Sequence, residues 1–479
     1  MRQIFRHLAL LLLLGLMTSC HHAPPPIPPV SESKELVVIT RYGPTSYRKD
    51  TNGEQSGIEY DLAALFADYI HAKLRIVVAD RFSDIIPALV NHQVHLAAAG
   101  LTITPLRQNQ IFYGPDYQTV TEQAAYNSDT TEPIHSISDL IGKRIEVVAG
   151  SSYIEHLKAL KQKYPALQWI EKPKLETEEL LARLDSGETD VVIADSHIIK
   201  LTQNYFPNIA AGVAIAGDEE LAWAFPKDTD PQLMMQAHNF FKQIKQDGTL
   251  KRLLDRYYGH IARLSREDRE AFLRAINLDL PKFRKYFQEA QEYTDVDWRF
   301  LAAIGYQESH WDPFATSPTG VRGLMMLTED TADHMGVTDR LDPKQSIVAG
   351  AKYFVMMRDA LPNDIAEPDR SWLALASYNT GMGHLEDARV LADRLKMDPD
   401  SWTDLKKTLP MLSRPQYASQ VKHGYARGGE SVIFAENIRN YYDILMRFEK
   451  PYTPLFTPLG DKNKYRLGQG RTDKTAHAG

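Results

Sequence analysis

The pattern of apolar residues changes once along the chain, near residue 260, and this change limits the fold most. Before it, helical and turn-rich stretches alternate with short apolar runs typical of buried strands, at 36–40, 74–79, 96–100, 144–150 and 190–195. Strands that alternate with helices predict α/β layers with mostly parallel sheets. After it, apolar residues recur at helical spacing, at 266–276, 283–293, 298–308, 346–358, 370–378 and 432–447. We therefore predict an α/β domain followed by an all-α domain.

The composition excludes several kinds of protein. The 479 residues are 43% hydrophobic and 24% charged, so two or three domains with large cores are allowed. A net charge of −7 gives no reason to expect a nucleic-acid partner. The single cysteine rules out internal disulfides and a cysteine-based zinc site, and the 16 histidines are scattered without His-Glu-x-x-His spacing. The residues therefore imply no metal and no cofactor.

The N-terminus has the marks of a secretory signal. Arg2 and Arg6 precede the apolar run 8–17, which is too short to span a bilayer as a mature helix. Small residues directly before Cys20 resemble a lipobox, which implies that Cys20 is acylated. His21 after it, rather than aspartate, favours the periplasmic face of the outer membrane, by analogy with other lipoproteins. The alternative is an ordinary signal peptide with an incidental cysteine.

These features divide the chain into five parts. We expect a signal peptide at 1–19, a lipidated proline-rich linker at 20–35 that acts as an extended spacer, and the α/β domain at 36–260. The all-α domain follows at 267–450, and the polar tail at 451–479 is expected to be disordered. No segment after the signal is apolar for long enough to span a membrane, so the lipid would be the only anchor.

The α/β half carries the motifs of a known family. The stretches 57–62, 101–107 and 112–117, together with the strand that ends at Asp195, resemble the family 3 periplasmic solute-binding proteins. The resemblance covers about residues 36–259. It implies two lobes with a ligand between them, at the carboxyl ends of strands. The expected ligand of this regulatory domain is an amino acid or a muropeptide.

Five residues are candidates for this ligand site. Arg107 offers a planar fork that can hold a carboxylate by two parallel hydrogen bonds. Thr102 and Ser152 supply hydroxyls, and Asp195 can accept from an ammonium group, as the matching family position does. Tyr47 matches an aromatic position that often covers the ligand. The alternative is that Arg107 and Asp195 are structural ion-pair residues in a cleft that has lost its ligand.

The helix expected at 298–307 has signals at both ends. Asp297 is a natural N-cap residue directly before it. Pro313 follows shortly after the other end and cannot continue a helix. Glu308 falls at the end of this helix.

Four short blocks in the helical half carry the strongest functional signal. The first is Glu308 with Ser309. The other three follow in chain order, at Gly320–Leu327, Ala376–Gly381 and Glu436–Tyr441. In this order the blocks resemble the family 1 lytic transglycosylases, which share a goose-type lysozyme-like helical fold. The second block of that family usually ends in glutamine, where this chain has Met326.

The resemblance implies cleavage of the β-1,4 bond between N-acetylmuramic acid and N-acetylglucosamine in peptidoglycan. Glu308 would first protonate the glycosidic oxygen. It would then take the proton of the muramic acid C6 hydroxyl, which closes a 1,6-anhydro ring without water. Ordinary glycosidases need two carboxylates for hydrolysis. An acid in this role must hold its proton near neutral pH, and the apolar neighbours Met325 and Met326 would favour that.

The resemblance also implies roles for other residues of the four blocks. Ser309 would orient the carboxyl or bond the acetamido group of the substrate. Tyr378 and Asn379 would stack on and bond the sugars, and Tyr441 would lie near Glu308. Alternatively, Tyr441 is a core aromatic residue and Ser309 an ordinary residue at a helix end.

Together the two halves predict an enzyme with a regulatory sensor, anchored by lipid at the outer membrane, with peptidoglycan as its substrate. Two alternatives stay open. One is a solute-binding or wall-binding lipoprotein with an inactive lysozyme-like domain. The other is a hydrolase, as in goose-type lysozyme. Product masses distinguish the two enzymes, because anhydro ends are one water lighter than reducing ends.

Overall fold

The computed structural model describes residues 26–43, 46–49, 53 and 55–453. The predicted signal peptide, Cys20 and nearly all of the predicted tail lie outside the described residues. The chain divides into two compact units. The first comprises residues up to Thr119 with 149–152 and 219–242, and the second comprises 120–148, 153–218 and the chain from Gln243 onward.

The first unit is built on parallel strands, as predicted. Strand β1 pairs in parallel with β4 on one side and with β5 on the other, and β10 runs antiparallel to β5. The expected strands at 36–40, 74–79 and 96–100 are confirmed within one or two residues. The elements are α2 (Val30–Ser33), β1 (Glu35–Thr40), β2 (Arg48–Lys49), β3 (Gln55–Ser56), α3 (Ile58–Tyr69), β4 (Lys73–Val78), α4 (Ile85–Val90), β5 (Leu96–Thr102), α5 (Pro105–Gln108) and the start of α9 (Pro231–Gln246).

The α/β part of the second unit is also built mainly on parallel strands. Strand β7 pairs in parallel with β8 and β9, and β9 pairs antiparallel with β6. Its elements are β7 (Ile145–Val148), α6 (Ser152–Lys163), β8 (Ile170–Lys172), α7 (Thr177–Asp185), β9 (Val191–Asp195) and α8 (Ser196–Gln203). The long strands β6 (Ile111–Asn127) and β10 (Ile209–Pro226) contribute to both units. The predicted α/β class is therefore confirmed, with antiparallel pairs at β6 and β10.

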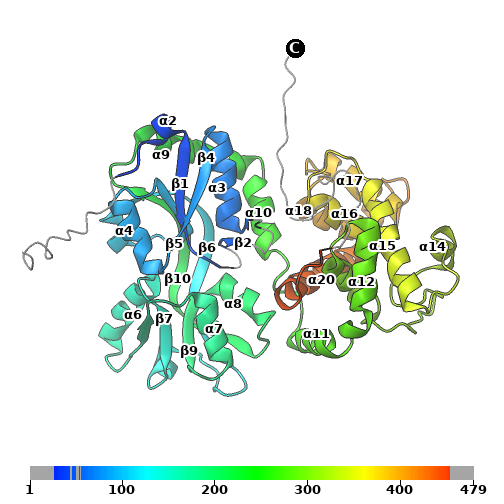
Figure 1. Cartoon of the computed structure of the whole chain (residues 1–479), viewed down its shortest axis with the longest axis horizontal. Coiled ribbons are helices and arrows are strands. Elements are labelled where there is room, and N and C mark those ends of the chain that lie inside the picture. Colours follow the sequence, from blue (N-terminus) through cyan, green and yellow to red (C-terminus); the bar gives the residue numbers. More distant parts are fainter. Residues whose placement is uncertain (1–25, 44–45, 50–52, 54, 454–479) are drawn as a thin grey trace, which may run out of the picture. The chain divides into compact units, whose positions relative to one another are not determined.

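The rest of the second unit is helical, which confirms the all-α half of the prediction. Helix α20 packs against α13 and α16, and α15 packs against α12 and α16 (Figure 1). The elements are α10 (Thr249–Tyr258), α11 (Arg266–Leu278), α12 (Leu280–Thr294), α13 (Trp298–Ser309), α14 (Glu329–His334), α15 (Pro343–Asp359), α16 (Asp369–Thr380), α17 (Met382–Arg394), α18 (Trp402–Thr408), α19 (Pro415–Ala418) and α20 (Gly428–Phe448).

Helix α13 runs through the core of this helical part. Residues 300–306 are all buried, because the helix packs against α12 on one side and α20 on another. Its N-cap is Asp297, as predicted, whose carboxylate accepts a hydrogen bond from the main-chain N–H of Arg299 at 2.8 Å. The helix therefore enters the core at a fixed position and carries Glu308 in its last turn.

The end of α13 is set by two left-handed residues rather than by Pro313. His310 has φ 54° and Trp311 has φ 62°, so the helix stops at Ser309, before the proline. Left-handed backbone is unfavourable for such residues and needs support from the surrounding structure. The indole of Trp311 is 2% exposed and donates to the carbonyl of Ala302 at 2.9 Å, which provides that support.

Within the second unit, a buried ion network joins α10 to α18 and α20. The guanidinium of Arg439, 2% exposed, donates to Glu436 at 2.7 Å and to the carboxylate of Asp255 at 3.2 Å. Lys406 also pairs with Asp255. Burial alone would raise the pKa of Asp255, but the charges of Arg439 and Lys406 outweigh it and lower that pKa. The network holds charges that would be costly to bury unpaired.

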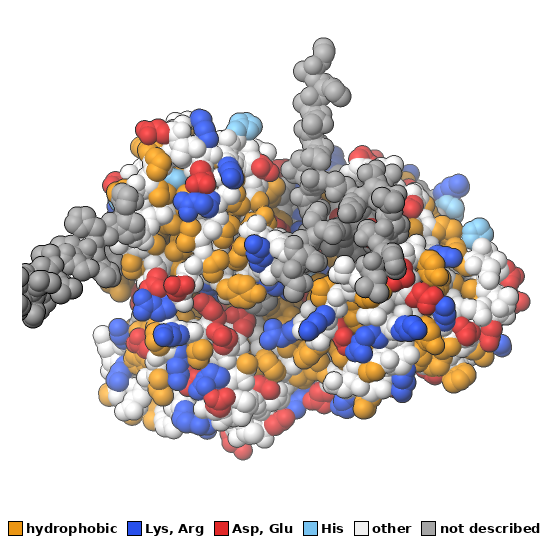
Figure 2. All heavy atoms as spheres, viewed as in Figure 1, with side chains coloured by type: hydrophobic (Ala, Val, Ile, Leu, Met, Phe, Trp, Pro, Cys, Tyr) orange, Lys and Arg blue, Asp and Glu red, His pale blue; other side chains and the backbone are white. Residues whose placement is uncertain are grey.

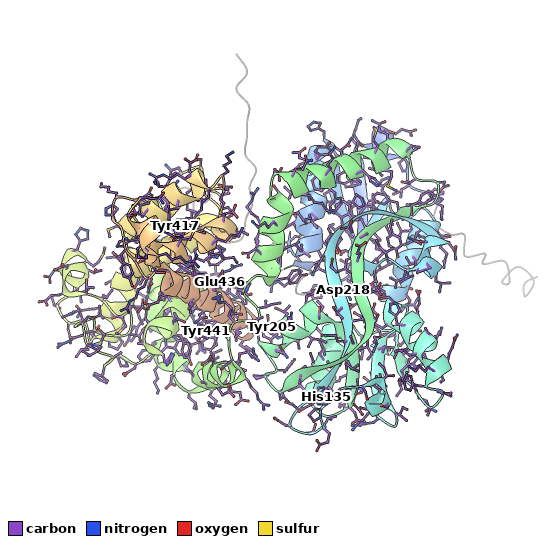
Figure 3. The ribbon with its side chains drawn as sticks, turned by 180° about the vertical axis from the view of Figure 1, so that it is seen from behind. His135, Tyr205, Asp218, Tyr417, Glu436 and Tyr441 are labelled. Carbon is purple, nitrogen blue, oxygen red and sulfur yellow. The ribbon has the colours of Figure 1, made fainter. Side chains whose placement is uncertain are left out.

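A second set of contacts joins the α/β part of this unit to α20. The ring of Tyr205, which follows α8, lies 6.5 Å from that of Phe448, and the guanidinium of Arg447 lies 4.5 Å from the Tyr205 ring centroid. Glu436 and Tyr441 lie on this helix, which ends near Tyr205 (Figure 3). Helix α20 is therefore shared between the core of the helical part and the α/β part of the same unit.

Candidate active site

Glu308 lies where α13 leaves the core. The residues before it, up to Tyr306, are buried, whereas Glu308 itself is partly exposed. Protein atoms nevertheless surround the carboxyl closely, and burial raises the pKa of Glu308 from its ordinary value of 4.5 to about 8. At neutral pH this carboxyl is therefore mostly protonated and can donate its proton. The geometry thus gives a carboxylic acid that is accessible and still neutral.

The loop before α14 forms one apolar neighbour of α13. Leu324 and Met325 are fully buried, and the main-chain N–H of Met325 donates to the hydroxyl of Ser346 at 3.0 Å. Two glycines on neighbouring helices leave room for this loop. A methyl group on Gly350 would lie 2.8 Å from Met325, and one on Gly305 would lie 2.9 Å from Leu324. The loop therefore packs closely on α13 and α15, and the apolar pocket for the carboxyl of Glu308 stays a prediction.

Gly323 and Met326, in this loop, adopt left-handed backbone. Gly323 has φ 83°, and a side chain there would collide with the main-chain oxygen of Arg340 at 1.8 Å. Met326 has φ 46° and is partly exposed, whereas Met325 before it is buried. The side chain of Met325 therefore packs in the core, whereas that of Met326 reaches the surface.

Ser309 ties the end of α13 to this loop. Its hydroxyl lies 2.8 Å from the carbonyl of Leu324, to which it donates, and 3.3 Å from the carbonyl of Gly305. The proton of this hydroxyl is thus directed to the main chain. An oxygen lone pair stays available to accept from a substrate amide. The predicted contact between Ser309 and the substrate stays a prediction.

Tyr378 is brought close to Glu308 from α16. Its phenol donates to the carbonyl of Met325 at 3.3 Å. Burial raises the pKa of Tyr378 well above 10, and the charge of Glu308 raises it further. Its ring stacks on Phe434 at 6.2 Å between centroids and meets the edge of Tyr353 at 5.1 Å.

Tyr353, on α15, was not singled out in the sequence. It is partly buried, and burial raises the pKa of its phenol. Its position beside Tyr378 depends on how α15 packs against α16. A tyrosine in an amphipathic helix carries no sequence signal that distinguishes it from other core-facing aromatic residues.

Asn379 is exposed next to Tyr378. The hydroxyl of Ser431 donates to its side-chain oxygen at 2.9 Å, so the first turn of α20 fixes the orientation of the amide. The amide nitrogen of Asn379 is then directed elsewhere and can donate to a sugar. The sequence did not single out Ser431.

Tyr441 lies in an aromatic cluster beside α13. It is 5% exposed, and its ring centroid lies 4.4 Å from that of Phe272 and 4.9 Å from that of Tyr306. Burial raises the pKa of its phenol. These contacts match the core aromatic alternative, and a role of Tyr441 toward the substrate stays a prediction.

The candidate ligand residues of the α/β half are divided between the two units. In the first unit, the buried guanidinium of Arg107 donates to the carbonyls of Thr102 at 3.2 Å and Gly150 at 2.9 Å. The hydroxyl of Ser152 donates to that of Thr102 at 3.1 Å. The structure thus brings three of the predicted residues together in one polar cluster.

The other two candidates are Tyr47 and Asp195. The phenol of Tyr47, in the first unit, donates to the side chain of Gln55 at 2.9 Å. Asp195, in the second unit, is the last residue of β9 and is 3% exposed. Ligand binding by these residues stays a prediction.

A buried carboxyl in the first unit escaped the sequence analysis. Glu59, 2% exposed, accepts from the main-chain N–H of Gly100 at 2.6 Å, from the indole of Trp223 at 3.1 Å and from the phenol of Tyr117. Burial raises its pKa. The residue lies within the stretch 57–62 that carried the family resemblance. We attribute the glutamate at position 59 to this hydrogen-bond network.

Comparison with known proteins agrees with both halves. Residues 36–260 match the model of bacterial extracellular solute-binding proteins, family 3, and residues 285–399 match that of the transglycosylase SLT domain. The class defined by fold and site is therefore a transglycosylase joined to a solute-binding module.

Curated relatives extend along nearly the whole chain. A membrane-bound lytic murein transglycosylase F from Methylobacillus flagellatus is 47% identical over 94% of this chain and 96% of its own. One with the same name from Nitrosospira multiformis is 45% identical over 95% of this chain and 94% of its own. The chain belongs to this enzyme family, the membrane-bound lytic murein transglycosylases F.

Proposed function

We propose that this chain cleaves the β-1,4 bond between N-acetylmuramic acid and N-acetylglucosamine in peptidoglycan, and that Glu308 acts first as acid and then as base. The proton of Glu308 goes to the glycosidic oxygen, and the bond from that oxygen to C1 of muramic acid breaks. The acetamido group of the substrate stabilises the cation that forms. The carboxylate then takes the C6 hydroxyl proton while O6 bonds to C1. Water is not consumed, and Glu308 ends protonated.

The observation that carries this proposal is the neutral carboxyl of Glu308 in its apolar surroundings. A general acid works best when its pKa lies near the working pH, and about 8 satisfies this. Burial is the cause of the raised pKa of Glu308.

Mass spectrometry of digested murein sacculi tests the reaction. The chain should release anhydromuropeptides, and its Glu308→Gln variant should release at least about 100-fold less, since general acid–base catalysis contributes roughly 10²–10⁴-fold. Reducing-end products would instead indicate a hydrolase. No product from the intact chain, on sacculi that a known enzyme digests, would favour a binding protein with an inactive domain.

We further propose that an amino acid or muropeptide bound by the α/β half modulates this activity. The supporting contacts lie within the second unit. The amide of Asn204, after α8, donates to the side-chain oxygen of Asn440 on α20 at 3.2 Å, and Asn440 donates to the carbonyl of His260 at 2.6 Å. Both asparagines are fully buried, and Asn440 directly precedes Tyr441. A change in structure around Asn204 would therefore alter the hydrogen bonds that hold α20.

The modulation requires a ligand that prefers one of two arrangements of the protein. Turnover measured with saturating amino acids or muropeptides tests it. The rate should change in the intact chain and should change less in the Asn204→Ala variant. An unchanged rate in the intact chain would contradict the modulation by a ligand, but it would not contradict the proposed cleavage reaction.

For location, we propose a lipid anchor on Cys20 that holds the chain at the periplasmic face of the outer membrane. Across the described part of the chain, no helix combines the length and apolar character needed to cross a bilayer. The names of the relatives include the words membrane-bound. The Cys20→Ala variant should move from the membrane fraction to the soluble fraction. Retention in the membrane fraction would contradict the lipid anchor.

A further inference from the structure

The loop between α19 and α20 is held in one shape although most of its side chains face solvent. The buried carboxylate of Asp387, on α17, accepts hydrogen bonds from three successive main-chain N–H groups, those of Lys422 at 3.1 Å, His423 at 2.8 Å and Gly424 at 2.9 Å. Farther along the loop, the N–H of Ala426 donates to the carbonyl of Leu412 at 3.2 Å. We call residues 421–427 the basic loop.

The basic loop borders the candidate active site. The ring of His423 lies so close to Gly383 that a methyl group on that glycine would come within 2.8 Å of it. Gly383 is in the first turn of α17, four residues after Asn379. On its other side the loop leads into α20, whose Ser431 bonds Asn379 at 2.9 Å. Both ends of the loop are thus anchored to elements that flank Asn379.

The side chains exposed on this loop are cationic and aromatic. Lys422, His423 and Arg427 are exposed, and Tyr425 is 64% exposed. Arg427 has a weak ion pair with Glu430 at 3.5 Å, with both side chains largely exposed. Among the described residues Lys422 makes no ion pair. The carboxylate of Asp387 accepts from main-chain N–H groups of the loop and not from the Lys422 ammonium group. On the face shown in Figure 2, Lys and Arg side chains are interspersed with Asp and Glu side chains.

From this arrangement we infer that the basic loop binds the acidic stem peptide of the peptidoglycan strand being cleaved. The inference rests on the proposed reaction. The stem peptide is attached to the muramic acid whose glycosidic bond would lie at Glu308, and it carries free carboxylates. A fixed main chain lowers the entropy cost of presenting Lys422 and His423 to such a carboxylate. Tyr425 adds an aromatic surface of the kind that packs against sugars or peptide.

Binding to two forms of the polymer tests this inference. Sacculi would be compared with glycan strands from which an amidase has removed the stem peptides. The full chain would carry Glu308→Gln, so that the readout does not depend on cleavage. Adding Lys422→Met should weaken binding to peptide-bearing sacculi about two- to fivefold, the range expected for an exposed charged contact. Binding to the stripped glycan should change less than about twofold, and higher salt should reduce the difference.

The matched control is Lys285→Met, which removes an exposed lysine from α12. It should change binding to neither polymer. Equal effects of Lys422→Met on both polymers, or effects equal to those of Lys285→Met, would overturn the inference. The proposed reaction is tested separately: if it is wrong, the protein with Glu308 intact releases no anhydro products.

Discussion

The hydroxyl of Ser309 donates to the carbonyl of Leu324 at 2.8 Å, and so the residue directly after the candidate acid holds the apolar loop against its helix. The loop in turn places Met325 under the phenol of Tyr378, which donates to the Met325 carbonyl. Hydrogen bonds therefore link Ser309, the apolar loop and Tyr378 to one another beside Glu308. The raised pKa of Glu308 is a property of this assembly and not of the glutamate alone.

The Ser309→Ala variant should weaken the attachment of the loop. We expect a loss of about 1 kcal/mol in the free energy of unfolding, the usual contribution of one hydrogen bond. Thermal unfolding measures it. The control is Ser413→Ala, whose hydroxyl also donates to a carbonyl, that of Pro410 at 2.8 Å, but in an exposed position. An equal loss in both variants would contradict the special role of the Ser309 contact.

The activity should depend on pH through the proton of Glu308. Since the pKa of Glu308 is about 8, the carboxyl is protonated below that value and loses its proton above it. The first step needs the protonated form, so kcat/KM should decline tenfold per pH unit above about pH 8. A profile of kcat/KM between pH 5 and 9.5 checks this. A decline that begins near pH 5 would contradict the raised pKa.

The stability of the protein should also depend on pH through Glu308. Between pH 4.5 and 8 the folded state binds a proton on Glu308 that the unfolded chain has released, so stability from this group falls as pH rises through that window. Glutamine at 308 is neutral at every pH. The melting temperatures of Glu308→Gln and the intact protein should therefore be close near pH 4, and the variant should melt increasingly higher toward pH 8. A constant difference would contradict the expectation.

Gly350 should be needed for the apolar pocket. In the Gly350→Ala variant the new methyl group would meet Met325 at 2.8 Å, so Met325 must move. Overpacking of this kind costs about 1–3 kcal/mol, which opposes the gain of up to about 1 kcal/mol from alanine in a helix. With Met325 displaced, the decline of kcat/KM should begin below pH 8. Gly217→Ala is the control, since its methyl group would meet no atom within 4 Å.

Asp255, in α10, should stabilise the protein through its contacts with helices farther along the chain. Replacing it by asparagine removes the negative charge that Arg439 contacts at 3.2 Å and that Lys406 also contacts. Breaking a buried pair in this way costs about 3 kcal/mol, measured by denaturant unfolding. Glu430→Gln removes an exposed pair at 3.5 Å and should cost less than about 1 kcal/mol. Similar losses in the two variants would show that the α10 network contributes little.

The sequence predicted the elements well because each has its own local signal. Alternating runs located β1, β4, β5, β7 and β9, and helical spacing located α11, α12, α13, α15, α16 and α20 within a few residues. The end of α13 was attributed to Pro313, but left-handed His310 and Trp311 end it earlier. That conformation depends on the buried indole of Trp311, and a distant contact of this kind leaves no trace in local sequence.

The sequence by itself determined the fold classes of the two halves and singled out Glu308, because strand and helix periodicities and short motifs are properties of neighbouring residues. Only the tertiary structure decided which groups surround that carboxyl. Tyr353 reaches Tyr378 from another helix, Ser431 fixes Asn379, and Gly350 admits Met325. These contacts join residues from 25 to 52 positions apart. The pKa of Glu308 follows from their packing, since desolvation depends on all atoms near the carboxyl and not on its neighbours in sequence.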